Sequence, residues 1–142
     1  MAATIPEEVE RIALSAAADV LGFPDNGTRR YDRAADRLVP GETTASAAER
    51  YDRERTAYER GDPNAAHAWR AFDEGESITV SGDAALQREG VASKVYLPVD
   101  GWGLLTLSDP ERDGVTETEE YLGRVLATNA AAALSGLDAD DS

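Results

Sequence analysis

The segment from Ser93 to Asp109 constrains the fold of this chain more than any other. It reads SKVYLPVDGWGLLTLSD, which is two β-rich runs joined by Asp100-Gly101. A two-residue Asp-Gly loop between such runs is a strong hairpin signal, because both central positions must accept a positive φ. The resulting register pairs Leu97 with Leu104 and leaves both faces of the hairpin largely apolar. We therefore expect a central hairpin that other elements cover on two sides.

Helical patterns lie towards both ends of the chain. A capping hydroxyl at Thr4 and a first-turn proline at Pro6 predict a first helix over about residues 6–21, ended by Gly22. A capping box at residues 116–119 predicts a C-terminal helix over about residues 117–136. The stripe of this second helix recurs at spacings of three and four residues and comprises Leu122, Val125, Leu126, Asn129, Ala130, Ala133 and Leu134.

The middle of the chain alternates shorter patterns. Strands are expected near residues 28–31, 37–42 and 77–80, and short helices over 62–75 and 84–88. Residues 45–60 are Ala-rich and charged, and indicate either an exposed helix or an irregular excursion.

The order of these elements predicts an α+β fold with a central antiparallel sheet of five or six strands. The N- and C-terminal helices are expected on one face of the sheet, and short helices and loops over the other. We expect a single domain over residues 1–137, followed by an acidic tail or the start of a linker at 138–142.

The charge balance indicates the setting in which the chain works. It has 14 basic and 28 acidic residues, a net charge of −14, and one lysine, Lys94. Such a surface is typical of proteins at molar salt, where a Debye length of roughly 3 Å screens repulsion between acidic groups. We find no cationic face suited to phosphates and expect no direct nucleic-acid contact. An acidic N-terminus without an apolar run of about 20 residues favours a cytoplasmic domain with no membrane insertion.

Few residues offer catalytic chemistry. The chain has no cysteine, which excludes disulfides, thiolate nucleophiles and thioether-bound cofactors. His67 is the single histidine, and both a structural role and a ligand contact stay open for it. The serines lack a nucleophile-elbow setting, and no Gly-rich phosphate loop follows a predicted strand. We expect no catalytic residue, no metal site, no cofactor and no enzyme activity.

Aromatic and cationic residues supply the candidate site, because several belong to elements that should enclose the sheet face opposite the terminal helices. One interpretation is core packing, and the other is a small-molecule pocket with polar groups at its wall. The expected register places Lys94 and Tyr96 on one face with Leu105 and Leu107. The candidate pocket residues are Arg29 (or its neighbour Arg30), Tyr31, Trp69, Phe72, Lys94, Tyr96 and Trp102.

Asn129 interrupts the apolar stripe of the C-terminal helix. It lies either at the edge of the stripe or in a helix-to-helix seam, where a polar residue sets the register at a cost in stability.

Four segments together resemble a GAF domain, and more closely the GAF modules of haloarchaeal regulators and sensor proteins of the bacterio-opsin activator type. They are LGFPDNGTRRYD (21–32), HAWRAFDEGESITV (67–80), SKVYLPVDGWGLLTLSD (93–109) and VTETEEYLGRVLATNAAAAL (115–134). The resemblance covers nearly the whole chain and rests on the order of these patterns. It implies a central antiparallel sheet with terminal helices on one side and a small-molecule pocket under the middle helices on the other.

The resemblance also implies a non-catalytic sensory module of a transcription regulator or signal-transduction protein, one that binds an unknown small molecule. Such modules commonly form homodimers through their terminal helices, which here assigns dimer and signalling contacts to Leu122, Val125, Leu126, Asn129 and Ala133. The family's cyclic-nucleotide signature, its chromophore-attaching cysteine and the cysteines of its methionine-sulfoxide-reducing members are missing. The alternative is a ligand-free structural or dimerisation module whose own side chains fill the sheet face.

Overall fold

The computed structural model describes residues 6–45, 57–81, 92–109 and 114–140. In chain order its elements are α1 (Pro6–Ala16), the π-helical turn η1 (Ala17–Leu21), β1 (Asp25–Asp32), β2 (Arg37–Thr43), β3 (Tyr58–Glu59), the 3-10 turn η2 (Pro63–Ala65), α3 (Ala66–Glu74), β4 (Ile78–Ser81), β5 (Ser93–Val99), β6 (Gly103–Asp109) and α5 (Glu117–Asp140). Among these helices, none is both long and apolar enough to cross a membrane.

The strands form one six-stranded sheet in the order β3-β2-β1-β6-β5-β4. All of its strand pairs are antiparallel. At the sheet centre β1 pairs with β6, with Gly27 opposite Thr106, so the N-terminal hairpin β1–β2 is joined to the later hairpin β5–β6. The predicted α+β class and antiparallel sheet are confirmed.

The central hairpin forms, but its predicted register is wrong by one residue. Leu97 pairs with Leu105 and not with Leu104. The reason lies in the loop, where Trp102 N–H donates to the carbonyl oxygen of Val99 at 2.9 Å and thereby belongs to the turn. The loop therefore has three residues where the Asp-Gly signal predicts two.

The shifted register changes which side chains share a face. Gly101 has a φ of 73°, whereas Asp100 is not among the residues of positive φ, so the two-residue turn that needs positive φ at both positions does not form. Leu105 and Leu107 consequently face the terminal helices. Tyr96 lies on the opposite face, and alternation along β5 places Lys94 with it.

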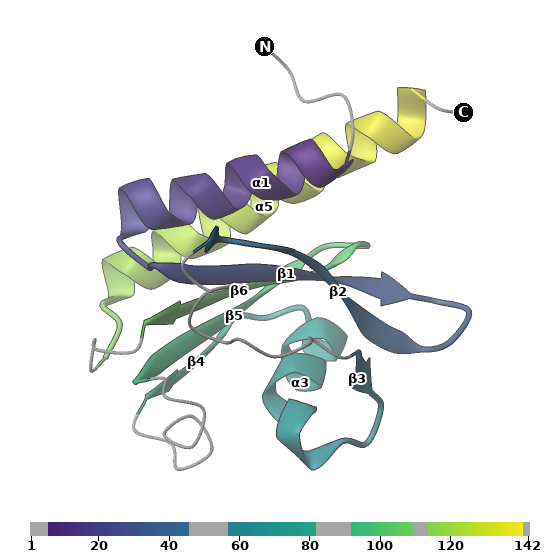
Figure 1. The fold of residues 1–142 in the computed structure, drawn as a ribbon, viewed down its shortest axis with the longest axis horizontal. Coiled ribbons are helices and arrows are strands. Elements are labelled where there is room, and N and C mark those ends of the chain that lie inside the picture. The colour runs from purple at the N-terminus through teal and green to yellow at the C-terminus, as the bar shows by residue number, and fades with distance from the viewer. Residues whose placement is uncertain (1–5, 46–56, 82–91, 110–113, 141–142) are drawn as a thin grey trace.

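The terminal helices lie side by side on one face of the sheet (Figure 1). They run antiparallel, so the start of α1 and the end of α5 lie at the same end of the molecule. The core between them and the sheet joins leucines of β5 and β6 to Phe23 and Leu14. Gly123 allows α5 to approach the sheet closely, since a Cβ there would lie 3.2 Å from Leu97 Cδ1.

The ends of both terminal helices follow their local signals. The predicted first helix is present over its full length, although its last turn is π-helical, and Gly22 ends it with a φ of 79°. The capping box forms both hydrogen bonds: Thr116 N–H donates to Glu119 Oε1 at 2.9 Å, and Glu119 N–H donates to Thr116 Oγ1 at 3.1 Å. The helix continues to Asp140, so residues 138–140 of the expected tail are helical.

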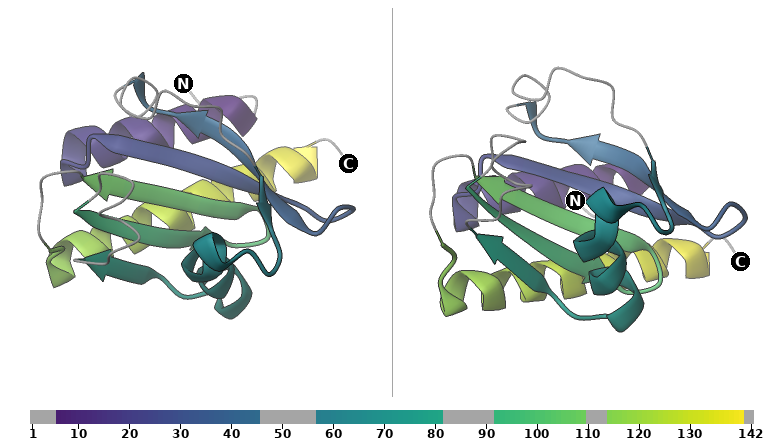
Figure 2. Two further views of the ribbon diagram at one scale, coloured as in Figure 1. Left: turned by 60° about the horizontal axis from the view of Figure 1, so that its bottom comes forward. Right: turned by 90° about the horizontal axis from the view of Figure 1, so that it is seen from below.

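The short helix α3 packs on the opposite face of the sheet (Figure 2). The two-residue strand β3 precedes it and pairs Tyr58 with Leu38. At its C-terminal end this strand corrects the helix considered for residues 45–60, because Tyr58 pairs with β2 in an extended conformation and packs on the core there. The remainder of that segment over 46–56, and the helical turn expected at 84–88, lie outside the described residues.

Candidate functional site

Aromatic rings fill the space between α3 and the sheet. Trp69 is 5% exposed, and its indole Nε1–H donates to the carbonyl oxygen of Glu59 at 3.0 Å. The ring of Tyr31 lies 4.7 Å from that of Phe72 and meets Trp69 edge-on at 6.2 Å. Tyr96 is equally buried and contributes to the same cluster. We call these four side chains the α3 aromatic cluster. Their packing anchors α3 on the sheet.

An ion-pair network lies at the outer edge of α3. It comprises Arg60, Asp36, Asp73 and Tyr31, and we call it the Arg60 cluster. The Arg60 guanidinium bonds to Asp36 in the β1–β2 turn at 2.8 and 3.2 Å and to Asp73 on α3 at 2.7 Å. It also stacks over the Trp69 ring, 3.9 Å from the ring centre. The Tyr31 hydroxyl donates to Asp36 Oδ1 at 2.7 Å. One side chain thus ties α3 to the tip of the β1–β2 hairpin.

The same contacts shift the ionisation of their members. The hydrogen bond from Arg60, and after it the one from Tyr31, lowers the pKa of Asp36 below its usual value. The hydrogen bond to Asp36 raises the pKa of Tyr31, and the two carboxylates raise the pKa of Arg60. Asp36 and Arg60 are therefore both charged at neutral pH, while the Tyr31 hydroxyl stays neutral.

Beyond α3, the same face of the sheet carries buried polar side chains, which we call the polar sheet patch. Asp25, Thr106, Ser108 and Arg29 are each 7% exposed or less. The strand register places Ser108 between Asp25 and Lys94, and Thr106 between Gly27 and Tyr96. A sheet face inside a domain is ordinarily apolar. In this patch, polar side chains are buried although their desolvation costs free energy.

Two cations belong to this patch: the buried Arg29, and the half-buried Lys94, which pairs with Ser108 across the strands. Arg29 lies with its guanidinium 3.5 Å from the centre of the Tyr58 ring and donates to the carbonyl oxygen of Leu38 at 3.4 Å. Lys94 Nζ lies 5.1 Å from the centre of the Tyr96 ring. Each cation is thus held against an aromatic face by a cation–π contact.

Six of the seven predicted pocket residues lie on the α3 side of the sheet. Tyr31, Trp69, Phe72 and Tyr96 belong to the α3 aromatic cluster, and Arg29 and Lys94 to the polar sheet patch. Trp102 does not join them, because the three-residue loop turns it toward the core under the terminal helices. His67 lies near Tyr96, with ring centres 6.1 Å apart.

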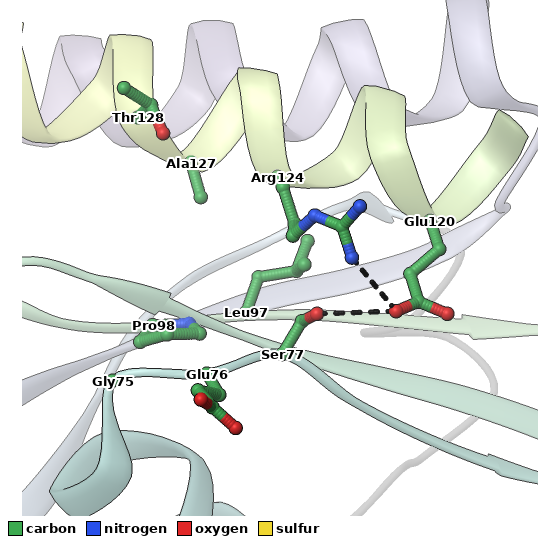
Figure 3. A pocket seen from close by; sticks show the side chains of 9 residues that line it. All are labelled: Gly75, Glu76, Ser77, Leu97, Pro98, Glu120, Arg124, Ala127 and Thr128. Carbon is green, nitrogen blue, oxygen red and sulfur yellow. Dashed lines mark hydrogen bonds and ion pairs between the residues drawn. The ribbon is translucent and has the colours of Figure 1, made fainter. Parts of the chain in front are cut away.

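A second feature was not predicted from the sequence. An open groove of about 500 Å³ lies between α5 and the connection from α3 to β4 (Figure 3). Leu97, Pro98 and Ala127 form its apolar part, and Ser77, Glu120 and Arg124 its polar part. No local motif marks it, because its two walls come from segments far apart in the chain.

Within the described ranges, no group of three or more acidic or histidine side chains is arranged to hold a metal ion. On the α3 side, the described residues present aromatic side chains, two cations and a few hydroxyl groups.

Comparison with known proteins fixes the fold type. No protein-family model and no curated protein matches the chain. Among solved structures, the GAF domain of a two-component sensor histidine kinase from Bacillus halodurans matches with a TM-score of 0.78 and 10% identity, covering 99% of this chain and 100% of that one. The chain has the GAF fold.

Further solved structures with a similar fold include a GAF domain and an enzyme. The second GAF domain of DevS from Mycobacterium smegmatis matches with a TM-score of 0.73 and 22% identity over 97% of this chain and 100% of that one. The free methionine-R-sulfoxide reductase from Neisseria meningitidis, solved with its substrate, matches with a TM-score of 0.77 and 15% identity, covering 97% and 83%. At such identities the likeness concerns the GAF fold alone.

Proposed function

We propose that this chain is a non-catalytic sensory module that binds a small molecule on the α3 side of its sheet and signals through its terminal helices. The observation that carries the proposal is the division of one sheet into two faces. Buried polar and cationic side chains lie on the α3 face, and the terminal helices pack on the other. A ligand bound on the first face can bias the second only through a differential affinity for two arrangements of the sheet and helices.

The setting of this module is part of the same proposal. We infer that it is the input domain of a cytoplasmic signal-transduction or transcription-regulating protein, in line with its resemblance to GAF modules of the bacterio-opsin activator type. Its acidic surface, with a net charge of −14, suits a salt-rich interior. It opposes direct contact with nucleic acid, since phosphate neutralisation needs clustered cations.

We further infer that two copies associate through α5. Leu122 and Val125 are each 38% exposed, and Asn129 and Ala133 continue the same helix face one and two turns further on. From Tyr121 to Gly136 this helix carries no Asp or Glu, in a chain where 28 of 142 residues are acidic. Two copies with a net charge of −14 each repel one another, so an acid-free helix face is the surface on which they approach most readily.

The outward residues have the spacing of a coiled-coil seam, with Leu122, Val125 and Asn129 separated by three and then four residues. In such a seam Asn129 would set the register. Leu126 is different, because it packs against the core under the helices and contributes less to the outer surface.

The first experiment is to purify the chain at molar salt and to release bound compounds by denaturation for mass spectrometry. We expect one small molecule per chain. The variants Arg29→Met and Lys94→Met should lose it, whereas Arg33→Met, which removes an exposed cation at the β1–β2 turn, should retain it. A protein that is empty in every preparation would contradict ligand sensing.

A ligand-free dimerisation module is the second candidate function. It is favoured by the dense packing of the α3 aromatic cluster, where Trp69 and Tyr96 are each 5% exposed. An empty protein that remains a dimer at working salt would support this candidate over the first.

A further inference from the structure

We propose that Glu120 couples α3 to the start of α5, so that a displacement of α3 changes how α5 is held on the sheet. This inference rests on the proposed function, because it supplies a route from the α3 face to the signalling helix.

From α5, the Glu120 side chain hydrogen-bonds to residues at the edge of the sheet. Ser77 Oγ donates to its Oε1 at 3.4 Å, and Thr79 Oγ1 donates to its Oε2 at 3.3 Å. Arg124, one turn along the same helix, donates to Oε1 at 3.0 Å. Figure 3 shows the carboxylate between Arg124 and Ser77. Glu120 therefore has one set of partners on the edge of the sheet and another on its own helix.

The partners of Glu120, Ser77 just before β4 and Thr79 within it, are connected to α3 by a very short stretch of chain. Gly75 ends α3 with a φ of 67°, and its N–H donates to the carbonyl oxygen of Ala71 at 2.9 Å. Only Glu76 separates this helix end from Ser77. A shift of α3 along or away from the sheet must therefore displace the Ser77 hydroxyl, since so short a stretch has little slack.

The groove leaves room for that displacement. It occupies about 500 Å³ between residues 75–77 and α5, so the two segments face open space beside the Ser77–Glu120 contact. The hydrogen bonds from Ser77 and Thr79 are long and correspondingly weak, and the contact with Arg124 is shorter and charge-assisted. When the Ser77 and Thr79 hydroxyls move away, Glu120 keeps Arg124 as a charge-assisted partner, so both the bound and the released arrangement leave the carboxylate paired. Such a pair of arrangements is what a coupling element requires.

The test is amide hydrogen exchange, measured by mass spectrometry on the full chain. The perturbation is Arg60→Ala, which breaks the Arg60 cluster and loosens α3. In the otherwise native chain we expect this change to speed exchange in α3 and also, by roughly fivefold, in residues 121–126 of α5, as about 1 kcal/mol of lost local stability would do. In a Glu120→Ala background the response in α3 should remain and the response in α5 should disappear.

Two further variants separate coupling from simple destabilisation. Glu117→Ala removes an equal charge from the same first turn at an exposed position, and should leave the α5 response intact. Glu120→Gln keeps an acceptor for the Ser77 and Thr79 hydroxyls and should restore much of the response. An α5 response that is equal with and without Glu120, or absent throughout, would overturn the coupling.

The outcome is separable from that of the proposed function. A coupled chain that never contains a small molecule supports the role of Glu120 and contradicts ligand sensing. A chain that binds a molecule but shows no coupling contradicts the role of Glu120 alone.

Discussion

Asp36 and Arg60 form a bidentate ion pair between the β1–β2 turn and the segment that precedes α3. The Nε–Oδ2 distance is 2.8 Å and the Nη2–Oδ1 distance is 3.2 Å. Arg60, and after it Tyr31, lowers the pKa of Asp36. A carboxyl group whose pKa is lowered by folding stabilises the fold above its unfolded pKa of about 3.9 and loses this effect as the pH falls through the folded value.

We therefore expect Asp36→Asn to lower Tm at pH 7, and the difference from the native chain to close as the pH falls below about 4. Thermal unfolding at constant salt over this pH range measures the effect. Asp100→Asn is the matched control, because Asp100 is exposed and asparagine is equally suited to its turn. Molar salt should narrow the difference, since exposed ion pairs are screened. A difference that is the same at every pH would exclude the Asp36 charge as its cause.

At Gly103 the backbone of β6 passes very close to the backbone of β1. A Cβ at this position would collide with the carbonyl oxygen of Arg29 and lie 3.0 Å from its carbonyl carbon. We expect Gly103→Ala to destabilise the chain by about 3 kcal/mol, the upper part of the range for overpacking, as measured by urea unfolding. Gly136→Ala serves as the control, because a Cβ there meets nothing within 4 Å, and it should stabilise α5 by up to about 1 kcal/mol. Similar small effects at both positions would contradict the close strand approach.

Local sequence signals predicted most of the elements. The capping box at Thr116 and the turn glycine Gly22 mark helix ends through hydrogen bonds and backbone angles that involve only near neighbours. The hairpin register was not predictable in this way. Its loop length depends on whether Asp100 adopts a positive φ, and in the longer loop Trp102 packs against the core under the terminal helices.

The candidate site was predicted in part. Alternation along β5 places Lys94 and Tyr96 on one face, and helical spacing places Trp69 and Phe72 together, so both pairs follow from periodicity. The groove and the contacts of Glu120 depend on a meeting of Ser77 and Glu120 across 43 residues. No local pattern encodes that meeting, because it follows from how α5 lies across the edge of the sheet.

Glu10 is a buried carboxylate, 2% exposed, between α1 and the β1–β2 hairpin. Its Oε1 accepts a hydrogen bond from the Thr28 hydroxyl and one from Glu42 N–H at 3.3 Å. Glu10→Ala leaves these two donors without that acceptor, and we expect a loss of about 1–3 kcal/mol in the free energy of unfolding.

Glu10→Gln retains one acceptor oxygen, so its loss in the free energy of unfolding should be clearly smaller than that of Glu10→Ala. Chemical denaturation of both variants checks this prediction, with Arg11→Ala, an exposed neighbour on α1, as the control for changes to the helix surface. If the alanine and glutamine variants are equally stable, the carboxylate does not serve as an acceptor for these donors.

Val125 is the point at which the proposed dimer is tested most directly. It is 38% exposed on the acid-free face of α5, and it does not belong to the core beneath the helix. A carboxylate there would be buried against its counterpart in a second copy, so we expect Val125→Asp to weaken association at least about tenfold while leaving Tm at low protein concentration nearly unchanged. Sedimentation velocity at working salt measures the association. Ala66→Asp places the same charge on an exposed position of α3 and should leave the dimer intact. A native chain that is monomeric at every accessible concentration would contradict assembly through α5, and Val125→Asp would then have no effect to show.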